Sequence, residues 1–173
     1  MTFRAVAADL KAVRYRVSLG YKDTKKPIVS KPVRVTIWRW IPLSEYDPYY
    51  ETSGLLFGET AINGVRYVGW GASVYSHAGA WEARFTPGHH CKTFRGVLGV
   101  GDVSDDSSSG TIKLTADDQV IYDSSSLTPG MDLPVSVPAR QAVRLGIQLL
   151  DTSPDGLESW PVIGEPELLC TGV

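Results

Sequence analysis

The 173-residue sequence lacks long apolar runs, is poor in cysteine and contains few helix signals. No stretch of about 18 consecutive apolar residues is present, which excludes a transmembrane helix. The two cysteines, Cys91 and Cys170, are too few for a disulfide scaffold or a zinc site, so they form either one bridge or two buried thiols. Only residues 3–13 could form a helix, and a strand is the alternative there. The sequence therefore predicts a mainly β protein.

Charged residues are unevenly distributed along the chain, although the net charge is only −2. Residues 1–40 contain ten Lys or Arg and two acidic residues, a net charge of +8, and the remainder contains seven basic and seventeen acidic residues, a net charge of −10. This asymmetry predicts that the N-terminal part docks on an acidic surface. The chain's own acidic body or a neighbouring copy is the expected surface. Nucleic acid is not the expected partner, because the pI of about 5.9 means that the body would repel phosphate.

Short alternating stretches, separated by 17 glycines and 11 prolines, indicate many short strands. Apolar and polar residues alternate at 13–19, 81–85 and 112–116, and a strand buried on one face requires this period of two. Residues 116–119 (ADDQ) predict a hairpin turn, because Asp tolerates the left-handed backbone that such turns use. The pattern is typical of a sandwich or barrel.

A boundary is expected within residues 42–58, which are rich in Pro, Gly and Tyr and show no sustained period. Two strands are predicted before it, at 12–20 and 32–41, and we assign them to an N-terminal β-rich arm of residues 1–58. Residues 59–173 are long enough to form a single sandwich domain.

Five short motifs follow one another in the second part of the chain. They are AINGVRY (61–67), SHA (76–78) followed by Phe85, FRGVLGVGD (94–102), the hairpin GTIKL with DDQVIYDS (110–124), and Trp160 before PEL (166–168). In their order and spacing they resemble the NPCBM family of carbohydrate-binding modules, which are galactose-binding-like jelly rolls. The resemblance implies an all-β, jelly-roll β-sandwich that binds sugars without catalysis, while residues 1–58 find no match.

The sequence departs from the family pattern at three places. The paired acids after the glycine-rich strand are Asp102-Val103, the usual Asp-Gly turn is Asp118-Gln119, and the acids before the final Trp are reduced to Asp155 and Glu158. If these positions contribute to the sugar site, the departures alter binding.

Sugar binding needs an aromatic ring against the apolar face of a pyranose, together with polar groups for the hydroxyls. The candidates, placed by the resemblance on loops at one end of the sandwich, are Trp70, Tyr75 and His77 from residues 69–79, and Glu158 and Trp160 from the last loop. Arg66 and Asp102 are candidates for further hydroxyl contacts. The alternative is that both tryptophans belong to the core and that His77 is structural. The glycines beside Trp70 favour an exposed loop.

Metal binding and catalysis find little support in the sequence. The segment His89-His90-Cys91 places possible ligands on adjacent residues, whereas zinc sites space them by two or more, so a turn is expected. No G-x-S-x-G string and no glycine-rich phosphate loop is present. We therefore expect no enzyme and no cofactor; a structural calcium ion is the one exception that the jelly-roll class leaves open.

Two functions fit these patterns. The first is a carbohydrate-binding module for galactose-like or related glycans. The second is an assembly protein that displays the sandwich on a phage or virus particle, as a capsid decoration or tail component, with residues 1–58 as the docking arm. Asp9 and Lys11 interrupt any apolar run near Met1, so no signal peptide is expected. The expected location is extracellular or on a particle surface.

Overall fold

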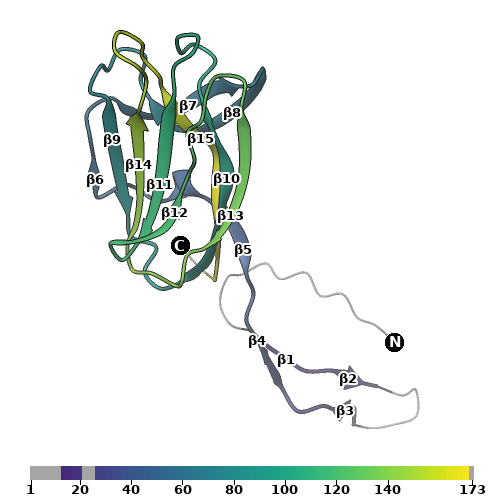
Figure 1. The fold of residues 1–173 in the computed structure, drawn as a ribbon. Coiled ribbons are helices and arrows are strands. Elements are labelled where there is room, and N and C mark those ends of the chain that lie inside the picture. Colours follow the sequence, from purple (N-terminus) through teal and green to yellow (C-terminus); the bar gives the residue numbers. More distant parts are fainter. Residues whose placement is uncertain (1–12, 21–25, 172–173) are drawn as a thin grey trace.

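The computed structural model describes residues 13–20 and 26–171, and within them the chain is built from strands and one short 3-10 helix, η1 (Leu43–Glu45). The helix-or-strand alternative for residues 3–13 falls almost entirely outside this range. Figure 1 shows a two-layered sandwich from which a narrow ribbon projects. No helix in the described part of the chain has the length and hydropathy needed to cross a membrane.

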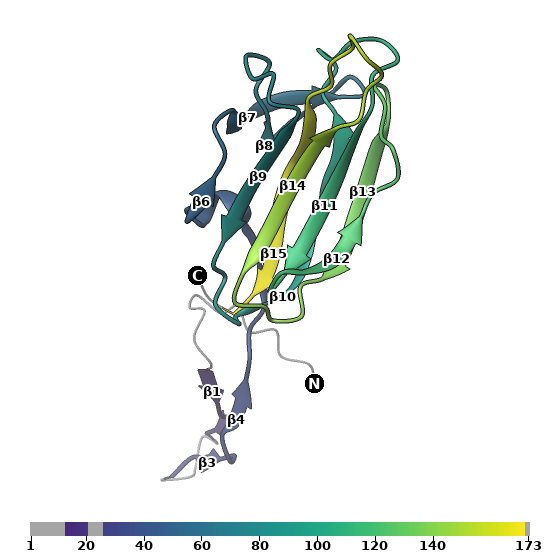
Figure 2. The same cartoon turned by 60° about the vertical axis from the view of Figure 1, so that its left-hand side comes forward.

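The sandwich consists of two antiparallel sheets, which confirms the expected all-β, jelly-roll class (Figure 2). One sheet has the order β13-β10-β15-β8-β7, and β5 also pairs with β15. Its strands are β5 (Arg39–Pro42), β7 (Leu55–Ile62), β8 (Val65–Ala72), β10 (Cys91–Val100), β13 (Asp132–Pro138) and β15 (Pro161–Cys170). The other sheet has the order β12-β11-β14-β9-β6. Its strands are β6 (Tyr50–Glu51), β9 (Ala80–Phe85), β11 (Gly110–Ala116), β12 (Gln119–Asp123) and β14 (Leu145–Asp151).

The core lies between these sheets and follows the alternation of the sequence. In β11, every second residue from Gly110 to Ala116 is buried, and β9 alternates in the same way. Phe85 and Phe94 are the largest side chains that are fully buried. Burial of a side chain of this kind contributes about 1.5–3 kcal/mol, so the alternating strands supply much of the driving force for folding.

The predicted turn at 116–119 is confirmed. Ala116 pairs with Gln119, and the two residues between them, Asp117 and Asp118, have φ values of 47° and 63°. Two consecutive left-handed residues define the tight hairpin turn whose twist matches that of the flanking strands.

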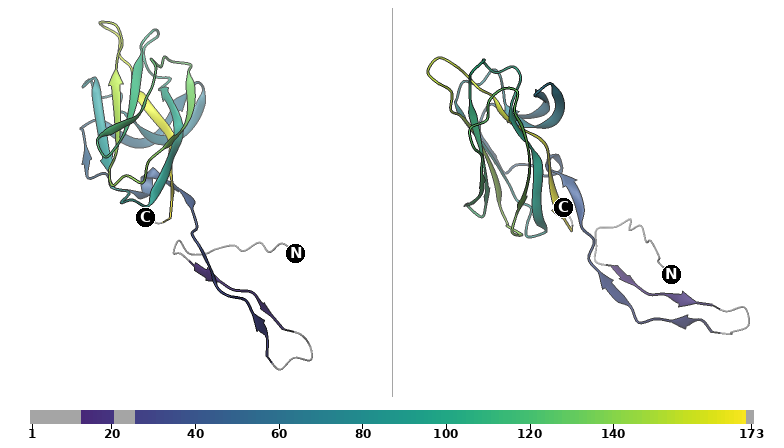
Figure 3. Two further views of the ribbon diagram at one scale, coloured as in Figure 1. Left: turned by 60° about the horizontal axis from the view of Figure 1, so that its bottom comes forward. Right: turned by 45° about the vertical axis from the view of Figure 1, so that its right-hand side comes forward.

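The N-terminal arm is a thin ribbon built from β1 (Val13–Tyr15), β2 (Ser18–Leu19), β3 (Ile28–Val29) and β4 (Val33–Val35). β1 pairs with β4, and β2 pairs with β3, so that both predicted strand regions are present within the described residues. Figure 3 shows the ribbon extending away from the sandwich.

The arm ends earlier than the sequence suggested. β5 pairs with β15, β6 pairs with β9, and the side chain of Leu43 is fully buried in the core. The strand pairing therefore places the start of the sandwich at Arg39 and not after residue 58. The segment 42–58 lacks a period because β5 ends in it, the short helix η1 and the two-residue strand β6 follow, and β7 begins only at Leu55.

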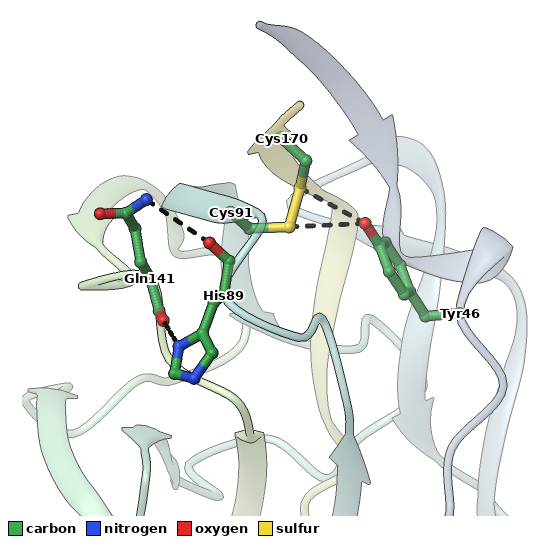
Figure 4. The surroundings of a disulfide bond; sticks show 5 residues. All are labelled: Tyr46, His89, Cys91, Gln141 and Cys170. Atoms are coloured by element: carbon green, nitrogen blue, oxygen red, sulfur yellow. Dashed lines mark hydrogen bonds between the residues drawn. A yellow bond between two sulfur atoms is a disulfide. The ribbon is translucent and has the colours of Figure 1, made fainter. Parts of the chain in front are cut away.

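Cys91 and Cys170 form a disulfide, which decides between the two alternatives left open by the sequence. They are direct cross-strand partners at the ends of β10 and β15, with Cα atoms 4.0 Å apart. The buried hydroxyl of Tyr46 lies 3.4 Å from each sulfur (Figure 4). Burial, with a smaller contribution from the charge of Glu45, raises the pKa of Tyr46, so this hydroxyl stays protonated.

Candidate functional site

Three loops meet at the end of the sandwich opposite the ribbon (Figures 1 and 2). They are residues 73–79 between β8 and β9, residues 101–109 between β10 and β11, and residues 152–160 between β14 and β15. Loops on a rigid scaffold are where binding groups concentrate in β-sandwiches.

Backbone hydrogen bonds fix the last loop against its neighbour. The backbone N–H of Glu158 donates to Asp105 Oδ2 at 2.8 Å, and the N–H of Asp105 donates to the carbonyl of Glu158 at 3.1 Å. The N–H of Trp160 donates to Ser104 Oγ at 3.0 Å, and its carbonyl accepts from the N–H of Gly101 at 2.9 Å. The backbones of Glu158 and Trp160 are therefore fixed by hydrogen bonds within the protein.

Asp151 anchors the base of the same loop. Its carboxylate accepts from the N–H of Ser153 at 2.8 Å and from the N–H of Ser159 at 3.1 Å, and the buried Ser159 Oγ lies 2.9 Å away. Burial by itself would raise the pKa of Asp151, but the hydrogen bonds from Ser153 and Ser159 outweigh it, and the pKa is lowered. The ionised carboxylate thus stabilises the loop that carries Glu158 and Trp160.

His77 and Glu158, both predicted as ligand-binding residues, form a pair. His77 Nδ1 lies 2.7 Å from Glu158 Oε1, and both side chains are substantially exposed. Within the described residues, neither the second carboxylate oxygen nor the second ring nitrogen has a hydrogen-bond partner. The pair therefore offers one fixed acceptor and one further ring nitrogen to a ligand.

Trp160 lines two hollows, and each hollow also contains other residues that were predicted to bind a ligand. On one side, a hollow of about 30 Å³ is lined by His77, Glu158 and Trp160, with Ser76 and Ser159 among its other lining residues. On the other side lies a groove of about 630 Å³, in the size range of ligand pockets. Its lining includes Phe57, Glu59, Arg66, Tyr75, Val103 and Trp160.

Tyr75 and Arg66 are surface groups of this groove. Tyr75 is 90% exposed, so that its side chain is open to solvent. Arg66 reaches across the β7–β8 hairpin and pairs with Glu59 at 2.6 Å. Both residues thus contribute to the groove and not to the small hollow.

Trp70 does not lie in an exposed loop, contrary to the expectation drawn from its flanking glycines. It is 6% exposed within β8, and its ring packs against Phe85 at 5.4 Å and Phe57 at 5.6 Å between centroids. The glycines have a different purpose: a Cβ atom on Gly69 would lie 1.9 Å from a backbone oxygen of β15. They let β8 approach β15 closely, and Trp70 is a core residue.

Asp102 also has an occupied carboxylate. One oxygen accepts from the N–H of Asn63 at 2.7 Å, and the other accepts from the N–H of Gly64 at 2.8 Å. These bonds hold the β7–β8 turn against the strand end that carries Asp102. Asp102 therefore has a structural role in the fold, and its contact with a sugar hydroxyl stays a prediction.

Two residues that support the site, Asp151 and Ser159, carry no periodic signal in the sequence. Their position in the chain near Glu158 and Trp160 is the only clue that the sequence offers.

Among residues 13–20 and 26–171, no three His, Cys, Asp or Glu side chains are grouped to hold a metal ion. His89 lies in a turn with φ of 66°, and its Nδ1 lies 2.6 Å from the carbonyl of Gln141. Cys91 is occupied by the disulfide. A structural calcium ion stays a prediction.

The fold is similar to that of several solved carbohydrate-binding modules. A Clostridium perfringens ZmpB structure with an M60 catalytic domain and the CBM51-1 and CBM51-2 domains matches with a TM-score of 0.61 and 20% identity, over 96% of this chain and 19% of that chain. The CBM51 of C. perfringens GH95, in complex with methyl-galactose, matches with a TM-score of 0.56 and 19% identity, over 75% of this chain and 99% of that one. This is the fold of CBM51 modules.

A third match has the same type of module. The tandem CBM51 modules of Sp3GH98, a family 98 glycoside hydrolase from Streptococcus pneumoniae SP3-BS71, give a TM-score of 0.59 at 14% identity, over 84% of this chain and 54% of that one. No family model and no curated protein matches the chain. These likenesses show the fold, and membership of the NPCBM family stays a prediction.

Proposed function

We propose that this chain is a non-catalytic carbohydrate-binding module whose ligand sits between the His77–Glu158 pair and the ring of Trp160. The observation that carries the proposal is the preformed pair itself, 2.7 Å between Nδ1 and Oε1, beside an aromatic residue at the loop end of a CBM51-like sandwich. The similar modules from C. perfringens were solved with methyl-galactose and with GlcNAc, which supports a monosaccharide-sized ligand.

In the proposed complex, polar side chains bind the hydroxyls of the sugar and an aromatic side chain packs against its apolar face. The Glu158 carboxylate accepts from one or two hydroxyls, and the second ring nitrogen of His77 donates to or accepts from another. Trp160 packs against the C–H face of the pyranose. The hydrogen bond between His77 and Glu158 fixes both groups before binding, so little side-chain entropy is lost when the sugar arrives.

We further propose galactose-like glycans as the ligand class and an extracellular location, where such glycans are displayed. Galactose carries its apolar C–H patch on one ring face and its hydroxyls around the rim. That division matches an aromatic residue and a carboxylate–imidazole pair that line the same hollow.

Isothermal titration calorimetry with methyl-galactoside, and separately with GlcNAc, tests this function. Glu158→Gln keeps the shape of the side chain and removes its charge, so binding should weaken about tenfold or more, since a hydrogen bond to a charged group is worth about 1.5–3 kcal/mol. Trp160→Ala should weaken binding comparably, whereas Lys113→Gln, on the outer face of β11, should leave it unchanged.

The proposal fails if neither sugar binds at millimolar concentration, or if Glu158→Gln and Trp160→Ala bind as well as the wild-type chain while folded. Binding of GlcNAc but not of methyl-galactoside would keep the site and reject the galactose-like class. Display on a phage or virus particle stays a prediction, and none of the compared structures bears on it.

A further inference from the structure

The ribbon formed by β1 to β4 has no partner of its own. Each of its two short sheets has only two strands, and within the described residues no third strand pairs with either. An isolated two-stranded hairpin is at best marginally stable in water, and its open edges can pair with another chain. Something that packs on the ribbon would therefore stabilise it.

Apolar side chains on the ribbon are turned toward solvent. Leu19 and Ile28 are cross-strand partners, and Ile28 is 75% exposed. Further exposed apolar residues are Val17, Val29, Val33 and Val35. Contiguous exposed apolar residues on a soluble protein indicate an interaction surface.

The ribbon also carries an unbalanced positive charge. Arg14 and Arg34 lie directly opposite each other in the β1–β4 pair, an arrangement that repels within the ribbon itself. The described residues 13–20 and 26–38 include three more cations, Arg16, Lys26 and Lys31, and no acid. The partner of the ribbon must therefore combine apolar surface with negative charge.

A groove on the sandwich combines apolar walls with acidic side chains. It lies where the edge of β15 changes partner, from β8 at residues 162–164 to β5 at residues 167–170. The groove has a volume of about 190 Å³, and its walls are Pro42, Ser44, Phe57, Val68, Glu165, Pro166 and Glu167. Phe57 and Val68 are exposed there.

The two glutamates of this groove, Glu165 and Glu167, differ in whether their carboxylates already have an ion-pair partner. Glu167 pairs with Arg95 at 2.6 Å, whereas Glu165 has no ion pair within the described chain and is exposed. Glu165 has a φ of 44°, which places it outside the regular strand geometry of β15. An arginine of an incoming ribbon would find an unpaired carboxylate beside apolar walls.

We propose that the ribbon of one molecule docks in this groove of a second copy. Figure 3 shows that the ribbon leaves its own sandwich at β5 and points away from it, so that in this arrangement it does not fill its own groove. A second copy supplies the same groove within an acidic body of seven basic and seventeen acidic residues beyond residue 40. Nucleic acid would pair with the arginines but would not cover Leu19 and Ile28, so a protein surface fits better.

Sedimentation velocity of the full-length chain over a range of concentrations tests the proposal. The expected result is a concentration-dependent increase in mass that weakens as salt is raised, because the charged contacts are partly screened. The double variant Arg14→Glu/Arg34→Glu keeps a like-charged cross-strand pair and so preserves the internal repulsion of the ribbon, but reverses its sign. It should associate about tenfold more weakly or worse.

Complementary variants identify the groove. Glu165→Arg should weaken association as well, and mixing it with Arg14→Glu/Arg34→Glu should restore it in the mixed species. Asp155→Arg, in the loop between β14 and β15 and outside the lining of the groove, is the matched control and should associate like the wild-type chain. Circular dichroism of each variant checks that the sandwich is folded.

Three results would overturn the proposal. The first is a monomer at every concentration and salt, and the second is association that neither charge variant changes. The third is binding of a single-stranded oligonucleotide, lost in Arg14→Glu/Arg34→Glu, by a chain that does not self-associate, which would assign the ribbon to nucleic acid. None of these results depends on sugar binding, so this test and that of the proposed function are separate.

Discussion

Replacing Trp70 by alanine should destabilise the protein without removing a sugar contact. The ring is 6% exposed, packs edge-on against Phe85 and lies against Phe57, so truncation leaves a cavity between β8 and β9. A buried Trp→Ala change costs about 3–5 kcal/mol. For a chain of this length, each kcal/mol lowers Tm by about 2–4 °C, which gives a decrease of roughly 6–20 °C.

Urea unfolding followed by circular dichroism measures this loss, and a sugar titration at low temperature measures binding to the folded fraction. Trp70→Phe is the matched control. The buried Nε1 of Trp70 has no hydrogen-bond partner in the described structure, so phenylalanine loses ring volume but no hydrogen bond and should destabilise less. A Trp70→Ala protein as stable as the wild type but unable to bind sugar would refute this assignment and make Trp70 the stacking residue.

Three further predictions concern the frame around the site. Gly69→Ala places a Cβ atom 1.9 Å from a β15 backbone oxygen and should lower the free energy of unfolding in urea by about 3 kcal/mol or more. Gly58→Ala is the control, because its Cβ atom meets nothing within 4 Å, and it should change this free energy by less than about 0.5 kcal/mol. The folded-state pKa of Asp151 is lowered, so this residue stabilises the fold fully above its unfolded pKa near 4, and the stabilisation is lost as pH falls through the folded pKa. Asp151→Asn should remove this part of the pH dependence of the free energy of unfolding. An unchanged pH dependence in the variant would contradict the prediction. The double variant Cys91→Ala/Cys170→Ala opens a crosslink with a sequence separation of 79 and should lower the free energy of unfolding by about 4–5 kcal/mol on loop-entropy grounds. A variant with the wild-type free energy of unfolding in urea would contradict this.

The sheet core and the hairpin at 116–119 could be predicted because both depend on local patterns. Alternation with period two reports burial on one face, and two aspartates can adopt the left-handed turn that joins β11 to β12. The start of the sandwich could not be found in the same way, since β6 is two residues long and is held by pairing with distant β9.

The site was predictable in part, for a related reason. His77 and Glu158 were both candidates, but their separation of 2.7 Å depends on two loops, 73–79 and 152–160, meeting across the fold. The sequence-based prediction for Trp70 was wrong because glycines beside a tryptophan are equally consistent with an exposed loop and with two strands that lie very close together. Only the proximity of β15 distinguishes the two.

The position of the disulfide has a mechanical consequence for the ribbon. β5, the first strand after the ribbon, pairs only with the last four residues of β15, and Cys170 faces Arg39 in that pair. The bond from Cys170 to Cys91 ties the same point to β10 (Figure 4). A pull on the ribbon is therefore transmitted through β5 to a covalently closed corner of the sandwich. The ribbon can bear tension there as a tether, while the loops that carry His77 and Glu158 lie at the far end of the sandwich.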